Sequence, residues 1–195
     1  LFLDNSKANY ENKRTLFTGL NGVIIVTPSK WLAGLVKQSF LKEYDIKVIN
    51  NGIDLDVFKP TPSNFRKKYD IGNKFIILGV ASVWTKKKGF EDFIKLSKIV
   101  DDEKQKIIMV GLSKTQLKNL PKNIIGIERT NSINELAEIY SAADVFFNPT
   151  YEDNYPTTNL EAIACGTPVV TYNTGGCSEI IDERTGLVIE QGCYD

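Results

Sequence analysis

The 195-residue sequence contains no histidine, and this absence limits its chemistry more than any other feature. Hydrolases that pair serine or cysteine with a histidine base are excluded, so proton transfer falls to carboxylates, lysines, tyrosines, backbone groups or the substrate. The three cysteines, Cys165, Cys177 and Cys193, form no CxxC pair. A disulfide scaffold and a metal site are therefore not expected, and the sequence indicates a cytoplasmic protein.

The sequence also lacks an excess of charge of either sign and any long apolar run. Basic and acidic residues both number 24, so no general attraction to nucleic acid is expected. No run reaches the length of a membrane span, and the first residues, Leu-Phe-Leu-Asp, show no signal peptide. Because the chain does not begin with Met, we expect it to be a piece of a longer protein.

Two common nucleotide-binding fingerprints are missing as well. Neither the glycine-rich G-x-G-x-x-G pattern nor a P-loop follows any of the strands that the sequence predicts. A dehydrogenase or a kinase therefore lacks its main sequence support.

Short apolar runs alternate with helical patterns along most of the chain. The first part predicts a helix within residues 1–20, a strand at 22–26, a helix capped by Thr27-Pro28-Ser29 and a strand at 46–49. Further strands are expected at 75–81, 106–110, 124–127, 145–148, 169–172 and 187–189, and helices at 90–100, 115–120, 133–142, 156–165 and 177–181. Six strands joined by five crossovers predict an α/β fold with a Rossmann-like, doubly wound parallel sheet.

A proline-rich segment divides the chain. Pro60 and Pro62 make residues 58–63 the best candidate for a linker. We therefore expect the tail of a first domain in residues 1–58 and the Rossmann-like domain in residues 59–195. No helix follows the last expected strand, so we also expect this second domain to be truncated.

The residues suited to chemistry gather between positions 151 and 176. Thr158-Asn159-Leu160-Glu161 fits a capping box, with Pro156 just before it as a suitable helix start. The preceding strand, 145–148, brings these residues to its carboxyl end, where the helix N-terminus offers free N–H groups. Open α/β sheets bind their ligands at this edge.

Three consecutive lysines precede Gly89 at the start of the helix expected at 90–100. Cations are unfavourable at a helix N-terminus, so the run indicates a nearby anion. Lys88 and the free N–H groups behind Gly89 would suit a phosphate. A solvated basic turn is the alternative, and it is favoured for Lys86 and Lys87.

The acids of this region have two interpretations each. Glu161 either completes the capping box or accepts hydrogen bonds from two vicinal hydroxyls, as in a ribose. Glu152 and Asp153 are either surface acids, slightly favoured by the nearby helix N-terminus, or ligand contacts.

The neutral residues around them are equally ambiguous. Thr157, Thr158 and Asn159 would either cap the helix or bind a diphosphate. Gly175-Gly176 is either a tight turn or a place where the backbone approaches a ligand. The spacing favours a nucleotide or sugar-phosphate site and does not specify the reaction.

Four segments follow one another in a recognisable order. They are Asn51-Gly52-Ile53-Asp54 with Phe58-Lys59-Pro60, then Lys88-Gly89, then EDNYPTTNLEAIACGTPVV from residue 152, then Thr174-Gly175-Gly176 with Glu179. In this order they resemble the NGID, K-G, E-x7-E and GG..E motifs of the family-4 type of retaining glycosyltransferases, also called glycosyl transferases group 1. The resemblance covers roughly residues 22–190. EDNYPTTN in particular is similar to members that build bacterial surface polysaccharides, including the colanic-acid type.

The resemblance implies the two-domain GT-B fold and a role for each matched position. Glu161 would hold the ribose hydroxyls of a nucleotide-diphosphate sugar, Lys88 would bind the diphosphate, and residues 127–129 would lie against the base. Glu152 or Asp153 would be the catalytic-side contact to the donor sugar. The implied donor-binding residues are Lys88, Gly89, Arg129, Asn154, Thr157, Thr158, Asn159, Glu161, Gly175 and Gly176. Such enzymes need no metal or other cofactor, because lysine and helix N-termini carry the leaving diphosphate.

Two positions depart from the family pattern. Eight residues separate Glu152 from Glu161 where the family has seven, whereas Asp153 has the family spacing. The contact to the donor sugar is therefore open between these two acids. The family often has an arginine six residues before its lysine, where this chain has Ser82. Either diphosphate binding is weaker than in the family, or Lys86 or Arg129 substitutes for the arginine.

The resemblance implies sugar transfer, with retention, from a nucleotide-diphosphate sugar to a saccharide or lipid-linked saccharide in surface polysaccharide synthesis. The chain would supply the donor-binding part of a hexosyltransferase, lacking most of the N-terminal acceptor domain and inactive alone. The whole enzyme would be cytoplasmic, with a peripheral place at the inner membrane face as a further expectation. The alternatives are a nucleotide-sugar epimerase or a phosphorylase on the same fold, or a non-catalytic nucleotide-binding module.

Overall fold

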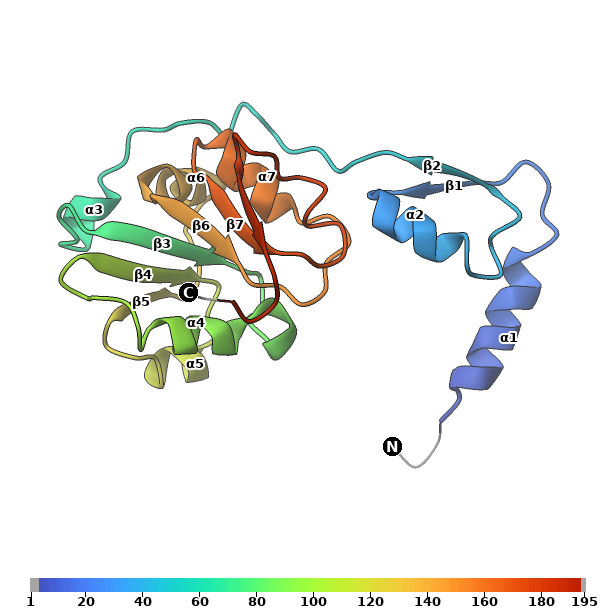
Figure 1. Ribbon diagram of the computed structural model, residues 1–195, viewed down its shortest axis with the longest axis horizontal. Helices are drawn as coiled ribbons and strands as arrows, with labels where there is room; N and C mark the ends of the chain where they lie inside the picture. Colours follow the sequence, from blue (N-terminus) through green and yellow to red (C-terminus); the bar gives the residue numbers. More distant parts are fainter. Residues whose placement is uncertain (1–3, 194–195) are drawn as a thin grey trace. The chain divides into compact units, whose positions relative to one another are not determined.

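The computed structural model describes residues 4–193, which form two compact units (Figure 1). The first unit ends at Asn50 and the second begins at Asn51. The sequence analysis expected the boundary between residues 58 and 59. In the structure, residues 51–58 belong to the second unit instead. We describe each unit by itself.

The first unit is a small βαβ arrangement preceded by a helix. Helix α1 spans Ser6–Phe17, and the parallel strands β1 (Ile24–Thr27) and β2 (Asp45–Val48) are joined by α2 (Lys30–Val36). The cap predicted within Thr27-Pro28-Ser29 is Ser29, whose side chain accepts a hydrogen bond from the Leu32 amide at 3.1 Å. The unit has few buried side chains, which include Ala33 of α2.

The second unit is built on a six-stranded parallel sheet, as predicted. Its strands are β3 (Phe75–Val80), β4 (Gln105–Val110), β5 (Ile124–Ile127), β6 (Val145–Asn148), β7 (Val169–Tyr172) and β8 (Gly186–Ile189). The order is β5-β4-β3-β6-β7-β8, with Ile77 of β3 beside Val145 of β6. The chain winds outward from β3 to β5, returns to β6, and winds outward again to β8. The reversal between β3 and β6 is the topological switch point, where such sheets leave a crevice.

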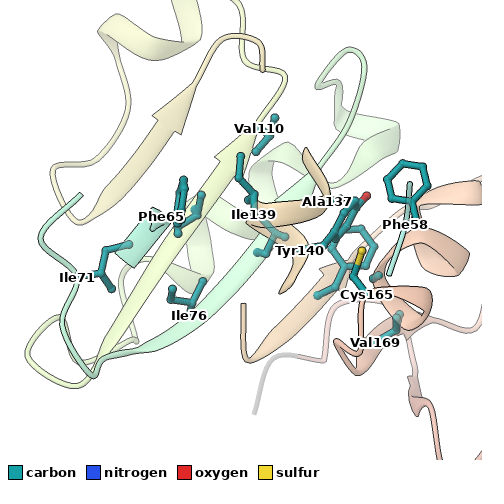
Figure 2. Close-up of a cluster of buried hydrophobic side chains, with 14 residues drawn as sticks. Phe58, Phe65, Ile71, Ile76, Val110, Ala137, Ile139, Tyr140, Cys165 and Val169 are labelled. Carbon is teal, nitrogen blue, oxygen red and sulfur yellow. The ribbon is translucent and has the colours of Figure 1, made fainter. Parts of the chain in front are cut away.

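Helices cover both faces of this sheet (Figure 1). They are α3 (Phe65–Lys68), α4 (Phe90–Leu96), α5 (Lys114–Lys118), α6 (Ile133–Ala142) and α7 (Thr157–Ala164), with a 3-10 turn at Lys86–Lys88. Successive strand residues face opposite ways, so Ile76 and Leu78 of β3 join one buried cluster and Ile77 the other. The cluster of Ile76 and Leu78 packs against α3, α6 and α7 and is called the α6/α7 cluster (Figure 2). The cluster of Ile77 packs against α4 and α5 and is called the α4/α5 cluster.

The helix predicted at 177–181 is wrong, because these residues form turns. Gly175 has a φ of 54°, which bends the chain directly after β7. The amide of Cys177 then bonds to Thr174 O at 3.0 Å, and the amide of Ile180 bonds to Cys177 O at 3.4 Å. These three-residue steps close single turns and leave too few residues before β8 for a helix.

The expected linker at 58–63 is also wrong, because this segment packs on the second unit. Phe58 is 5% exposed and lies edge-to-face with Tyr140 at 6.2 Å between ring centroids. The amide of Thr61 donates to Ser141 Oγ at 3.0 Å. Residues 58–63, here called the strap, therefore pack along α6. Within residues 4–193, no helix is both long enough and apolar enough to cross a bilayer.

Phe58→Ala tests whether the strap belongs to the core of the second unit. We expect the free energy of unfolding to fall by roughly 3–5 kcal/mol, because a large buried ring is removed. Leu55→Ala, three residues before Phe58 in the chain and 67% exposed, is the matched control and should change it by less than about 0.5 kcal/mol. Urea denaturation measures both, and similar small effects for the two variants would contradict this assignment.

Candidate functional site

A cleft of about 260 Å³ lies at the switch point, beside the carboxyl ends of β3 and β6. It is lined by Val80, Ala81, Ser82, Lys88, Asn148, Asp153, Tyr155, Pro156, Thr157 and Thr158. A more open hollow of about 470 Å³ shares Ser82, Lys88 and Asp153 and adds Glu152 and Asn154, among others. The structure thus brings the predicted lysine, one predicted acid and the start of α7 to one place.

Of the two candidate acids, Asp153 is the one that lines the cleft. Its Oδ2 lies 2.5 Å from Lys88 Nζ, and the two side chains are 20% and 38% exposed. Glu152 pairs instead with Lys87, and those side chains are 60% and 73% exposed. The hydrogen bond from Lys87 lowers the pKa of the Glu152 carboxyl.

The turn at Lys86–Lys88, here called the lysine turn, is held in place by backbone contacts with the loop after β6. Gly89 has a φ of 76°, and a Cβ there would lie 2.3 Å from Pro149 O, in the loop after β6. The amide of Tyr151 donates to Lys87 O at 2.7 Å, and the hydroxyl of Thr150 also donates to that oxygen, at 3.3 Å. Gly89 is therefore required for loop packing, whether or not its neighbours bind an anion.

Gly175 and Gly176 contact the loop that carries Glu152 and Asp153, at Asp153. A Cβ on Gly175 would lie 2.0 Å from Asp153 O, and the amide of Gly176 donates to that oxygen at 3.1 Å. On the other side, the amide of Tyr155 donates to Asp153 Oδ1 at 3.2 Å. The sequence suggested that the backbone of this glycine pair approaches a ligand. In the structure, the pair closely approaches the backbone of Asp153.

The capping box predicted for Thr158 and Glu161 is wrong, because α7 begins earlier. Pro156 takes the N-cap position, and no side chain caps the helix. Thr157 and Thr158 are therefore the first two helical residues, whose amides have no acceptor within the helix. Both line the cleft, so the start of α7 offers it two backbone donors and the positive end of the helix dipole.

Asn159 does not face the cleft in the way the sequence suggested. It is completely buried, its Oδ1 accepts a hydrogen bond from Asn148 Nδ2 at 2.8 Å, and its own amide bonds to Pro156 O. Asn148, which ends β6, lines the cleft in its place and was missed. A polar residue at the end of an apolar strand was the available signal.

Glu161 lies one helical turn after Thr157, and its carboxylate is bonded from the protein interior. The hydroxyl of the buried Tyr140 donates to Glu161 Oε2 at 2.9 Å. Burial raises the pKa of the Glu161 carboxyl, and the bonds from Tyr140 and Thr157 offset part of that rise. Tyr140 was not predicted as a site residue, because nothing in its sequence neighbourhood points to an acid 21 residues away.

Glu161, Arg129 and Asn154 are likewise not among the residues that line the cleft. Arg129 is exposed, and it follows β5 at the far edge of the sheet. Asn154 is exposed and lines only the open hollow. Across residues 4–193, no three or more acidic or cysteine side chains come together as a metal ion would require.

The chain belongs to the family of glycosyl transferases group 1, whose model matches residues 74–194. That range includes the whole cleft. The expected family and the Rossmann-like fold are both confirmed.

Several relatives of this chain are glycosyltransferases. The chain is 28% identical to processive diacylglycerol alpha-glucosyltransferase of Acholeplasma laidlawii over 75% of its length, and 30% identical to alpha-galactosylglucosyldiacylglycerol synthase of Streptococcus pneumoniae over 81%. It is 24% identical to the capsular polysaccharide biosynthesis glycosyltransferase CapM of Staphylococcus aureus over 82%. It spans only 47%, 46% and 46% of these proteins.

Solved structures share the fold. Sucrose-phosphate synthase from Thermosynechococcus elongatus matches 99% of this chain and 52% of its own, with a TM-score of 0.80 at 19% identity. Anabaena Alr3699/HepE in complex with UDP-glucose matches 96% of this chain and 55% of its own, with a TM-score of 0.77 at 19% identity. The C-terminal domain of the group 1 glycosyl transferase LpcC from Francisella tularensis matches 72% of this chain and 81% of its own, with a TM-score of 0.58 at 23% identity. The fold is that of GT-B glycosyltransferases.

Glu161→Gln tests whether the buried charge of Glu161 lowers the stability of the protein at neutral pH. A carboxyl whose pKa is raised by folding stabilises the protein while it is protonated and loses that stability as pH rises through its folded-state pKa. Glutamine keeps an oxygen for the Tyr140 hydrogen bond and removes the buried charge. We expect the variant to melt at a higher temperature than the parent at pH 7, with the gain vanishing below the ordinary pKa of 4.5. Thermal melts across pH 4–8 measure this, and a variant less stable at pH 7 would contradict it.

Proposed function

We propose that this chain is the donor-binding part of a retaining glycosyltransferase that takes its sugar from a nucleotide diphosphate. The observation that carries the proposal is the convergence of Lys88, Asp153 and the start of α7 on one cleft at the switch point. Family membership and a likeness to a fold solved with UDP-glucose support it. The base and the sugar of the donor are left open.

In the proposed complex, the diphosphate lies between Lys88 Nζ and the free amides of Thr157 and Thr158. One ammonium and one helix N-terminus match the charge that develops on the leaving diphosphate, without a metal ion or other cofactor. Asp153 is the proposed contact to the donor sugar, because it borders both the cleft and the open hollow. Glu161 is proposed to receive the ribose hydroxyls.

The acceptor is proposed to be a saccharide or a lipid-linked saccharide in surface polysaccharide or glycolipid synthesis. The names of these relatives refer to diacylglycerol glycosides and to a capsular polysaccharide, which support this class. We further propose that the full-length protein has an N-terminal acceptor domain, that transfer requires it, and that the enzyme works at the inner membrane face. If the full-length protein, incubated with the donor and no acceptor, forms an epimer of the donor sugar, the enzyme is an epimerase and the proposed sugar transfer is rejected.

Lys88→Ala tests the diphosphate site. We expect affinity for the nucleoside diphosphate to fall roughly 10-fold or more, through loss of a charge-assisted hydrogen bond, while affinity for the nucleoside barely changes. Lys86→Ala is the matched control, because this exposed lysine of the same turn does not line the cleft. Calorimetric titration with UDP, GDP or ADP and the parent nucleoside measures both. Equal losses for diphosphate and nucleoside, or for the two variants, would count against the assignment.

Asp153→Asn and Glu152→Gln decide between the two acids. Each variant removes one negative charge and keeps the size of the side chain. If Asp153 contacts the donor sugar, its variant should lower kcat/KM for transfer about 10-fold or more, and the Glu152 variant should stay within about 2-fold. The full-length protein with donor and acceptor is needed for this measurement. The reverse ranking would move the role to Glu152.

A further inference from the structure

The hydroxyl of Tyr140 reaches Glu161 from the interior of the protein. Tyr140 lies on α6 and has no exposed surface, so its hydroxyl must find a partner inside the fold. That partner is Glu161 Oε2, at 2.9 Å. Because the tyrosine is wholly buried, it cannot touch a ligand itself.

The ring of Tyr140 is held from two sides, which fixes the direction of its hydroxyl. Phe58 of the strap lies edge-to-face with it at 6.2 Å, and Phe146 of β6 does the same at 5.5 Å. Figure 2 shows Phe58 and Tyr140 within the same buried cluster. The carbonyl of Tyr140 also accepts a hydrogen bond from Thr167 Oγ1 at 2.6 Å. Neither the ring nor its backbone can turn without repacking the α6/α7 cluster.

The carboxylate of Glu161 therefore has a defined orientation before any ligand arrives. Tyr140 and Thr157 each form a hydrogen bond with it, and Thr157 also borders the cleft. A carboxylate has about four acceptor positions, so about two remain for a ligand. Two vicinal hydroxyls are the group that matches two acceptor positions on one carboxylate.

We propose that Tyr140 is a positioning residue for ribose recognition, which it serves by orienting the Glu161 carboxylate toward the 2′ and 3′ hydroxyls of a ribonucleoside diphosphate. This inference rests on the proposed function, because it takes Glu161 as the ribose contact. Its consequence is specific: the preference for ribose over deoxyribose depends on a hydroxyl that never meets the ligand. A purely structural hydroxyl would change stability and leave that preference unchanged.

Tyr140→Phe tests the inference in the full-length protein, with the ratio of affinities for ribose and 2′-deoxyribose ligands as the readout. UDP, GDP and ADP are each compared with their 2′-deoxy forms by calorimetric titration. We expect the parent to favour the ribose form about 10-fold or more and the variant to lose about 2- to 10-fold of that preference. Tyr172→Phe is the matched control, because Tyr172 is equally buried but belongs to the α4/α5 cluster, on the opposite face of the sheet. Its ratio should equal that of the parent.

Glu161→Gln separates failure of this inference from failure of the proposed function. A ratio that falls in Glu161→Gln and stays at the parent value in Tyr140→Phe overturns the positioning role and leaves the ribose contact standing. A parent without any preference, or a Glu161→Gln variant that keeps it, overturns both. If Tyr140→Phe does not fold, Phe58→Leu loosens the same ring and keeps the hydroxyl. An unchanged ratio in that variant also overturns the inference.

Discussion

Backbone contact between three loops is the constraint on which the cleft depends. Gly89 lets the lysine turn pack against Pro149, and Gly175 lets the turn after β7 pack against Asp153. A side chain at either position would overlap a backbone oxygen, which cannot move as the tip of a flexible side chain can. Lys88 and Asp153 are therefore held near each other by the main chain, and their ion pair is a result of this packing. An anionic ligand can compete for Lys88 without dismantling the loops.

The partly buried acid of α7 shows how stability and the proposed function oppose each other. Burial raises the pKa of Glu161, so its charge at neutral pH works against folding. The Tyr140 hydrogen bond reduces that cost and also fixes the carboxylate. An acid with no ligand to bind would be better replaced by a neutral residue at this position. Its cost to folding and its prepared geometry both fit a ligand contact.

The sheet was predictable because each strand is a separate apolar run, and the α2 cap was predictable because Ser29 acts on its own helix. Apart from the helix at 177–181, which local turns replace, the failures involve contacts between distant residues. The capping-box pattern was a local match, but the helix begins after Pro156, which frees Glu161 for Tyr140. The strap was misread as a linker because its prolines are visible in the sequence, whereas the burial of Phe58 against α6 is not. The choice between the two acids likewise required the position of the lysine turn.

The most direct measurement is a crystal structure of the full-length protein with the nucleoside diphosphate that binds best. We expect the diphosphate between Lys88 Nζ and the amides of Thr157 and Thr158, with both ribose hydroxyls within about 3 Å of the Glu161 carboxylate. A diphosphate seated against the exposed Lys86, with the switch-point cleft empty, would contradict the proposed donor site.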